Sequence, residues 1–186
     1  SARADFPGGS ASDLYDSIQR VLALPDEIDE TDVDRIRVFR YRGLYLGLIG
    51  LMNNPATSPL RTQLMFSRDG FAWNRLPDRP AFVENGAPGE WDQYSIHDPY
   101  PLVYQGKVYL YYKSDSDGDP RLVRMQGLAI ADHPLGPFKK HPLNPVINSG
   151  HETRLFPFKE GIAALVIKDG NEHFTVQYAE DGVNFQ

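Results

Sequence analysis

The sequence predicts an all-β protein of the β-propeller type that is preceded by one helix. After about residue 34, short segments rich in Val, Ile, Leu, Tyr and Phe are separated by turns that contain Gly, Asp, Asn or Pro. A unit of four such segments also occurs three times, and its opening acidic residues, Asp34, Asp98 and Glu152, lie 64 and 54 residues apart. Units of four strands at roughly 50-residue spacing are typical of propeller blades. We therefore expect the chain to cover about three blades.

The first expected element is a helix near residues 11–23. Ser10-Ala-Ser-Asp13 has the pattern of a capping box, and Leu14, Ile18, Val21 and Leu22 recur at helical spacing until Pro25. The stretch Asp26–Asp34 is acidic and poor in apolar residues, which is typical of a solvated connector. The predicted organisation is a helical segment and acidic connector over residues 1–30, followed by incomplete propeller blades over residues 31–186.

The strands follow in three similar groups. In each group a short strand meets a tight turn at a glycine (Gly43, Gly106 or Gly161) and an apolar strand follows. A second hairpin then has an Asp-containing turn, after which an aromatic residue opens the next strand. The expected strands are Arg35–Tyr41, Gly43–Met52, Arg61–Ser67, Ala72–Leu76, Pro101–Tyr104, Lys107–Tyr112, Met125–Ala131, Arg154–Phe158, Ile162–Lys168 and Phe174–Tyr178.

One of these turns supports the propeller. Ser67-Arg-Asp69-Gly70-x-x-Trp73 resembles the Asp-box turn of sialidase-type propellers, in which the Asp and the Trp lock a hairpin away from the channel. The alternative to a propeller is a β-sandwich whose hairpins are alike by chance. In a propeller the innermost strands start at the central channel, so Asp34, Asp98 and Glu152 would converge at one mouth.

Two of these acidic positions have neighbours suited to chemistry. Pro99 is expected to hold Asp98 in an extended conformation and so to aim its carboxylate; the alternative is an Asp that only caps its turn. His151 precedes Glu152 and would supply a proton donor that titrates near neutrality, beside an ion that orients it. The alternative for this pair is a surface His-Glu without a role.

Further candidates surround these positions in the sequence. Trp91 and Tyr100 flank Asp98 and could stack on a sugar ring, although both could equally be core residues. Arg124 and Gln126 are polar residues on or near an inward strand and are candidate substrate ligands, as is His97. A metal site built from His97 and His151 is conceivable, but it lacks a ligand-spacing motif.

Composition excludes several classes of function. The sequence has no cysteine, so a disulfide framework and a thiolate metal site are excluded. The net charge is −6, and residues 1–34 hold nine acidic residues against two arginines, so we expect no basic face for nucleic acid. The longest nearly apolar run, Leu44–Met52, has about half the ~20 residues of a membrane helix, and no stretch has the layout of a signal peptide. We therefore expect no membrane partner.

Two carboxylates and a titratable donor across a channel are the arrangement that glycosidic bond cleavage needs, because one group protonates the leaving oxygen while another activates water. Glycoside hydrolysis is the predicted reaction class. Two alternatives remain: a fragment that binds carbohydrate or takes part in assembly but lacks the general base, and a structural β-domain that binds no saccharide.

The chain also resembles a known family over His97–Lys113, Val123–Ala131 and Asn144–Glu152. These segments are similar to glycoside hydrolase family 117, the α-1,3-L-neoagarooligosaccharide hydrolases, which are related to family 43. The resemblance implies a five-bladed propeller and inverting release of 3,6-anhydro-L-galactose from the non-reducing end of neoagarobiose. It also implies a dimer that exchanges its N-terminal helical segment, a divalent cation near the channel, and a periplasmic or secreted bacterial location.

The resemblance assigns roles by position. Asp98 would tune pKa values and orient the substrate, His151 would be the general acid, and Glu152 would be the third acidic residue. The family's general base lies in an Arg-Asp-Pro-like turn of the first blade, which this sequence lacks upstream of Asp98. Asp34 is the only acidic residue at an equivalent repeat position, and it is the candidate for that role.

Overall fold

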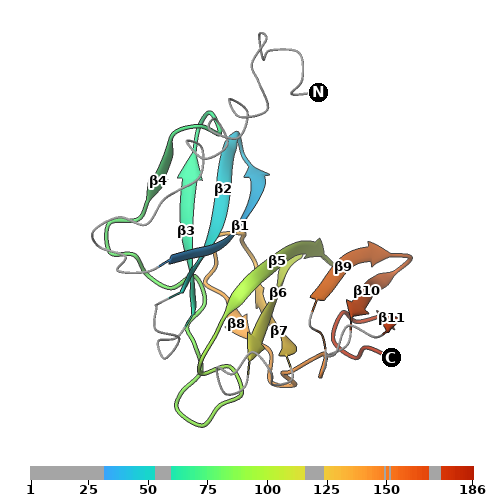
Figure 1. The fold of residues 1–186 in the computed structure, drawn as a ribbon. Helices are drawn as coiled ribbons and strands as arrows, with labels where there is room; N and C mark the ends of the chain where they lie inside the picture. Colours follow the sequence, from blue (N-terminus) through green and yellow to red (C-terminus); the bar gives the residue numbers. More distant parts are fainter. Residues whose placement is uncertain (1–31, 53–59, 116–123, 149, 151, 168–172) are drawn as a thin grey trace, which may run out of the picture.

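The computed structural model describes residues 32–52, 60–115, 124–148, 150, 152–167 and 173–186. In this part of the chain the regular structure is entirely β, with eleven strands in three antiparallel sheets (Figure 1). The all-β prediction is therefore confirmed. The expected helix at residues 11–23 and most of the acidic connector lie outside the described residues.

Each sheet is a meander of consecutive strands. Within each sheet, strands that follow one another in the sequence are hydrogen-bonded neighbours, so each sheet is made from one continuous stretch of chain. The first sheet contains β1 (Asp32–Tyr41), β2 (Leu44–Met52), β3 (Arg61–Ser67) and β4 (Trp73–Arg75); the second contains β5 (His97–Tyr104), β6 (Lys107–Asp115), β7 (Arg124–Ala131) and β8 (Lys139–Lys140); the third contains β9 (Glu152–Phe158), β10 (Gly161–Ile167) and β11 (Phe174–Ala179).

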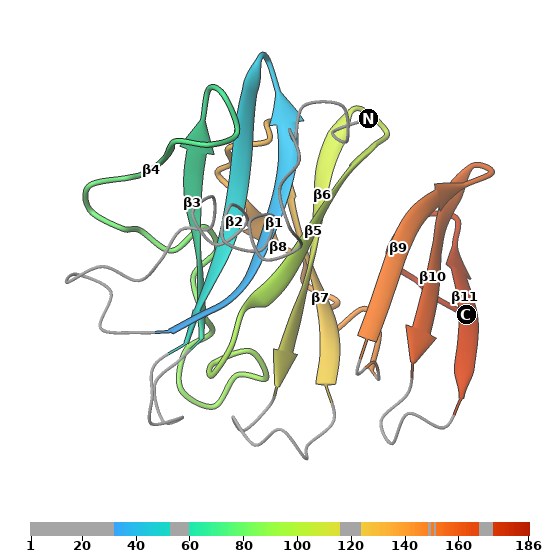
Figure 2. The same cartoon turned by 45° about the horizontal axis from the view of Figure 1, so that its top comes forward.

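The three sheets lie side by side in chain order, as Figure 2 shows. The first strands of the sheets are neighbours, since β5 contacts both β1 and β9. This arrangement differs from the alternative of a sandwich, which would have two facing sheets. It matches the propeller-type prediction, in which the innermost strands of successive units adjoin one another.

The core forms because the middle sheet is buried on both faces. Side chains alternate between the two faces of a strand, and in β6 the residues Tyr109 and Tyr111 pack towards the third sheet while Leu110 and Tyr112 pack towards the first. Burial on both faces explains why this strand is a nearly continuous apolar run. The hydrophobic effect over these two interfaces holds the three sheets together.

The predicted turn chemistry is present in the first and third sheets. Asp69 Oδ1 accepts hydrogen bonds from the backbone N–H groups of Phe71 and Ala72 at 2.8 Å each, and Trp73 Nε1 donates to the carbonyl of Gly70 at 3.1 Å. The Asp-box interpretation is thus confirmed in its hydrogen bonds. Asp181 accepts the N–H groups of the second and third residues after it in the same way.

The start of β5 and the presence of β8 differ most from the sequence prediction. The strand expected at Pro101–Tyr104 begins four residues earlier, at His97, because an irregular register between His97 and Tyr100 lets the pairing with β6 continue past Pro99. The two-residue strand β8 was not predicted, since two lysines carry no alternation of apolar and polar residues. None of the described residues forms a helix long and apolar enough to cross a membrane.

Candidate functional site

Two acidic side chains from different sheets come together at the starts of β5 and β9. Arg35 on β1 joins them: its Nη1 donates to Asp98 Oδ2 and its Nη2 to Glu152 Oε1, each at 3.1 Å. One guanidinium therefore connects the first strands of all three sheets. The convergence predicted for Asp98 and Glu152 is observed.

Two more cations complete the cluster. Arg37 Nη2 donates to Asp98 Oδ1 at 2.7 Å. The Lys113 Nζ atom lies 3.7 Å from Asp98 Oδ2 and 3.5 Å from Glu152 Oε1. Because Asp98 Oδ2 and Glu152 Oε1 both lie within 3.7 Å of the same ammonium nitrogen, the two carboxylates face a common space. The side chains of Asp98 and Lys113 are 8% and 3% exposed, whereas that of Arg35 is 45% exposed.

The backbone at the site departs from regular strand geometry at two points. Asp98 has φ +47°, so the expectation that Pro99 holds it extended is wrong. The cause is the register shift between His97 and Tyr100, which resembles a β-bulge and turns the carboxylate towards the cluster. A left-handed conformation costs a non-glycine residue about 1–2 kcal/mol. β1 has a second register shift between Val33 and Ile36, around Arg35.

The electrostatics of the cluster keep both acids ionised. Burial alone would raise the pKa of Asp98, but the hydrogen bond and charge of Arg37, with the charges of Lys113 and Arg35, bring that pKa below its usual value. Burial would also raise the pKa of Glu152, but the hydrogen bond and charge of Arg35 and the charge of Lys113 outweigh it and lower that pKa. Burial lowers the pKa of Lys113 against the opposing attraction of Glu152 and Asp98. At neutral pH both carboxylates are therefore bases and not proton donors.

Three other predicted residues lie beside the cluster. His97 on β5 and Gln126 on β7 are the strand partners of Lys113 on either side, and both are buried. Among the described residues, Gln126 Nε2 has no hydrogen-bond partner. Arg124 lies two residues before Gln126 on the same strand, and its charge contributes to lowering the pKa of Lys113.

The two predicted aromatic residues occupy different places. Tyr100 lies under Arg37, whose guanidinium carbon is 4.5 Å from the ring centroid. It therefore adjoins the cluster through a cation–π contact. Trp91 stacks on Tyr112, with ring centroids 5.8 Å apart and an angle of 17° between the rings, and packs against the core between the first two sheets. The sequence allowed two roles for Trp91, stacking on a sugar ring or packing in the core, and the contact observed is core packing.

Two predicted catalytic residues cannot be placed by their side chains. Asp34 belongs to β1, at the register shift, but its side chain lies outside the described residues. His151 lies wholly outside them, although Glu152, the next residue, opens β9.

Sequence reasoning missed the three cations Arg35, Arg37 and Lys113. Lys113 had a usable signal, because a lysine that directly follows the apolar run Val108–Tyr112 is an exception in a strand buried on both faces. Arg35 and Arg37 had a weaker one, since they alternate with apolar residues along β1. Their carboxylate partners are more than 60 residues away, and no local pattern indicates such pairs.

The described residues of the cluster do not suit a divalent cation. In this part of the chain no three His, Asp or Glu side chains are grouped closely enough to hold a metal. Asp98 and Glu152 instead face Arg35, Arg37, Lys113 and, at 3.7 Å from Glu152, Arg154. A divalent ion would have to displace these cations from the same oxygens.

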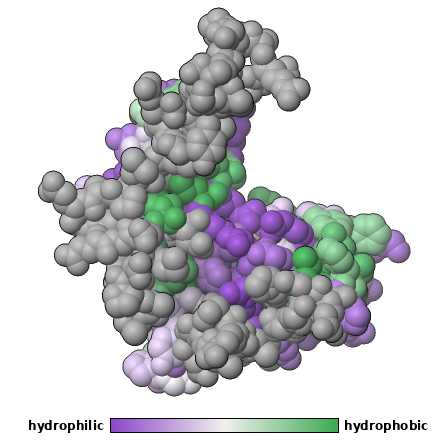
Figure 3. All heavy atoms as spheres, in the orientation of Figure 1, coloured by the Kyte–Doolittle hydropathy of each residue, from purple (hydrophilic) through white to green (hydrophobic). Residues whose placement is uncertain are grey.

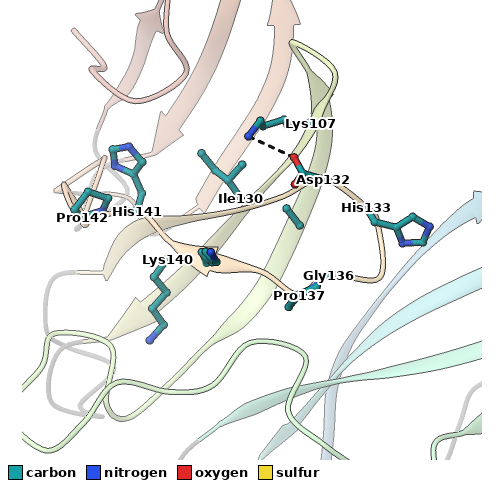
Figure 4. A pocket seen from close by; sticks show the side chains of 11 residues that line it. Lys107, Ile130, Asp132, His133, Gly136, Pro137, Lys140, His141 and Pro142 are labelled. Atoms are coloured by element: carbon teal, nitrogen blue, oxygen red, sulfur yellow. Dashed lines mark ion pairs between the residues drawn. The ribbon is translucent and has the colours of Figure 1, made fainter.

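A cavity of about 590 Å³ lies at the other end of the second sheet (Figure 4). Lys107, His133 and Lys139 contribute to its lining. Lys107 begins β6 and Lys113 is near its end, and six residues of extended chain span about 20 Å. The cavity is therefore separate from the carboxylates. The face drawn in Figure 3 has hydrophilic residues at its centre, between hydrophobic areas of the first and third sheets.

Comparison with known proteins gives matches of two kinds. No protein-family model matches the chain. A family 117 glycoside hydrolase produced by the marine bacterium Zobellia galactanivorans is 42% identical with a TM-score of 0.77; the match covers 89% of this chain and 48% of that protein. The chain thus spans about half the length of this relative. A curated beta-lactamase hydrolase-like protein of Xylella fastidiosa is 73% identical over only 26 residues, 14% of this chain and 6% of that protein, which is too little to indicate a shared fold.

More distant structures share the fold alone. A glycosyl hydrolase from Bacteroides ovatus has a TM-score of 0.64 at 14% identity and matches 84% of this chain and 49% of its own. An exo-beta-1,3-galactanase from Phanerochaete chrysosporium has a TM-score of 0.58 at 18% identity and matches 81% of this chain and 36% of its own.

Proposed function

The chain is related by sequence and by fold to the family 117 glycoside hydrolases, and from this relationship we propose that it carries part of the active site of a glycoside hydrolase. The single observation that supports this most directly is the pair Asp98 and Glu152, brought together from two sheets and bridged by Arg35. Glycoside hydrolases canonically use carboxyl groups that face a common space, and this pair supplies two such groups beside the candidate acid and the candidate base.

The proposed reaction is inverting. In such a reaction one group protonates the leaving oxygen while a carboxylate activates a water molecule on the opposite face of the sugar. The lowered pKa values of Asp98 and Glu152 make both unsuitable as the proton donor at neutral pH. Their ionised state supports His151 as the general acid, with Glu152 stabilising its charged form. Asp98 would then orient the substrate, and Asp34 is the candidate general base.

The proposed substrate is neoagarobiose or a longer neoagarooligosaccharide, from whose non-reducing end 3,6-anhydro-L-galactose is released. His97, Gln126 and Arg124 lie beside Lys113, and Tyr100 lies under Arg37; these four are the proposed substrate contacts. Trp91, which packs on Tyr112, is a fifth candidate. The test is to incubate the chain with neoagarobiose and to follow released anhydrogalactose by chromatography, with the anomer of the first product identified by proton NMR. The absence of turnover at micromolar protein would overturn the proposal for this chain.

A second candidate function is saccharide binding without cleavage. It is favoured by the share of the relative that the chain spans, 48%, because a five-bladed propeller with its general base on another blade would be incomplete here. In that case titration with neoagarooligosaccharides gives binding and no anhydrogalactose. A structural domain that binds no saccharide would give neither.

Assembly into a dimer or a larger oligomer is the proposed quaternary state. The outer face of the third sheet supports it, because five large apolar side chains on this face are exposed: Phe156, Phe158, Leu165, Phe174 and Val176. Contiguous apolar surface of this kind marks contact sites. We call this set the outer apolar face. The family relationship also favours a periplasmic or secreted location.

A further inference from the structure

Two carboxylates that face a common space normally compete for ionisation. Without a counter-ion, one of the pair keeps a proton and its pKa rises, as in the carboxylate dyad of aspartic proteases. Asp98 and Glu152 do not behave in this way: both have lowered pKa values although both are partly desolvated. Neighbouring cations supply the difference: Arg37 acts at Asp98, and Arg35 and Lys113 act at both carboxylates.

Two cations contact both carboxylates, and they differ in exposure. The Arg35 side chain is 45% exposed and the Lys113 side chain is 3% exposed. Charges at an exposed position are weakened by water and by salt, whereas buried charges are screened much less. The charge of Lys113 therefore acts more strongly on both carboxyl groups than the charge of Arg35 does, even though its distances of 3.7 and 3.5 Å are longer. Hydrogen bonds add to this: that of Arg37 lowers the pKa of Asp98 most, and that of Arg35 lowers the pKa of Glu152 most.

The position of Lys113 is fixed by β6. Its strand partners are His97 and Gln126, both buried, and it shares the strand face of Tyr109 and Tyr111, which pack in the core between the second and third sheets. The ammonium group thus projects towards β9 from a strand that cannot shift without disturbing that core. A lysine held in this way is a fixed charge and not a mobile surface group.

We propose that Lys113 is a positioning residue, the shared counter-ion that keeps Asp98 and Glu152 ionised together and so reserves proton donation for a third group. This inference rests on the proposed glycosidase function for its chemical meaning, but the ionisation that it describes is a property of the folded chain. In the part of the chain that the structure describes, the charged groups that contact the pair besides Lys113 are Arg35 and Arg37 on β1 and Arg154 on β9. His97 on β5 is a strand partner of Lys113, and the charge of Arg124 on β7 also acts on Lys113.

The experiment is a carboxyl titration by carbon NMR, with the Asp98 and Glu152 signals assigned from Asp98→Asn and Glu152→Gln. In the parent chain both carboxyl pKa values should lie below those of model peptides. Lys113→Met should raise at least one apparent pKa of the pair by about one unit or more, a tenfold change in the protonation equilibrium. Lys113→Arg should restore most of the shift, because it returns the charge.

The matched control is Lys107→Met. Lys107 lies on the same strand and pairs at 3.4 Å with Asp132, whose side chain is 90% exposed, so its loss should leave the Asp98 and Glu152 pKa values unchanged. Shifts below about 0.3 unit in folded Lys113→Met would overturn the proposal. If that variant does not fold, the parent titration decides: a pKa at or above the model-peptide value for either carboxyl group refutes the shared counter-ion.

Catalysis provides a separate readout. Where the chain hydrolyses a saccharide, Lys113→Met should move the acidic limb of the kcat/KM profile to higher pH, and Lys113→Arg should return it. A chain with no hydrolysis but with the expected NMR shifts would overturn the proposed function and leave the counter-ion role intact. Hydrolysis by Lys113→Met with an unchanged acidic limb and unshifted carboxyl signals would overturn the counter-ion role and leave the proposed function intact.

Discussion

Replacing Arg37 by methionine should destabilise the protein in a way that depends on pH. Arg37 makes a 2.7 Å charge-assisted hydrogen bond to Asp98, which is 8% exposed. Hydrogen bonds to charged groups contribute about 1.5–3 kcal/mol. Arg35 and Lys113 still contact the other oxygen of Asp98, so the charge is not left unpaired. We therefore expect a loss of about 2 kcal/mol at pH 7, below the 3–5 kcal/mol typical of an abandoned buried charge.

The pH dependence follows from the direction of the pKa shift. The pKa of Asp98 is lower in the folded chain than in the unfolded chain, so its ion pair stabilises the fold above the unfolded pKa and this stabilisation is lost as the pH falls through the folded pKa. The cost of Arg37→Met should therefore stay constant from pH 7 down to the unfolded pKa of about 3.9 and shrink as the pH falls below it. What remains is the lost cation–π contact with Tyr100, about 0.5–1 kcal/mol.

Urea unfolding at steps between pH 7 and pH 3 measures this difference. Arg40→Met is the control, because Arg40 is exposed on the same strand and its guanidinium carbon lies 5.5 Å from the ring centroid of Tyr45. It therefore has a cation–π contact but lies on the strand face opposite to Arg37. Its cost should be small and nearly independent of pH. An Arg37→Met cost that is equal at every pH would refute the argument and reduce Arg37 to a packing residue.

Three further predictions concern other parts of the chain. Lys140→Met removes the 2.7 Å ion pair of Asp92, whose side chain is 2% exposed, and should lower the unfolding free energy by about 3 kcal/mol. Lys139, the neighbour of Lys140 in the sequence, is exposed, so Lys139→Met should change the unfolding free energy little, and a cost above about 0.5 kcal/mol would count against this explanation. Phe174→Ser, on the outer apolar face, should lower self-association in light scattering, and a parent that is already monomeric at tens of micromolar contradicts the proposal. His151→Ala should lower kcat by about 10²–10⁴-fold with saccharide binding largely kept; turnover within about threefold of the parent would mean that another group is the acid.

The local elements were largely predictable, because their causes are local. The apolar residues Leu64, Met65 and Phe66, with turn residues on either side of the segment, were enough to place β3 at the bounds observed. The Asp69 turn followed from the hydrogen-bonding capacity of its own side chain. The repeat of acidic residues also placed Asp98 and Glu152 at the starts of two neighbouring first strands. The short β8 and the early start of β5 were missed, since each depends on pairing with a neighbouring strand.

The sequence by itself determined most of the β-strands, their turns and the acidic repeat that places Asp98 and Glu152 near the starts of β5 and β9, because these depend on side-chain period and on contacts within a few residues. The tertiary structure decided the ionisation of those acids. Arg35 and Lys113 meet Asp98 and Glu152 only after three sheets have packed, and the burial of Lys113 sets how strongly its charge acts. The left-handed backbone of Asp98 likewise arose from pairing with β6. Electrostatic energies depend on distance and on exposure to water, and neither quantity is present in the order of residues along the chain.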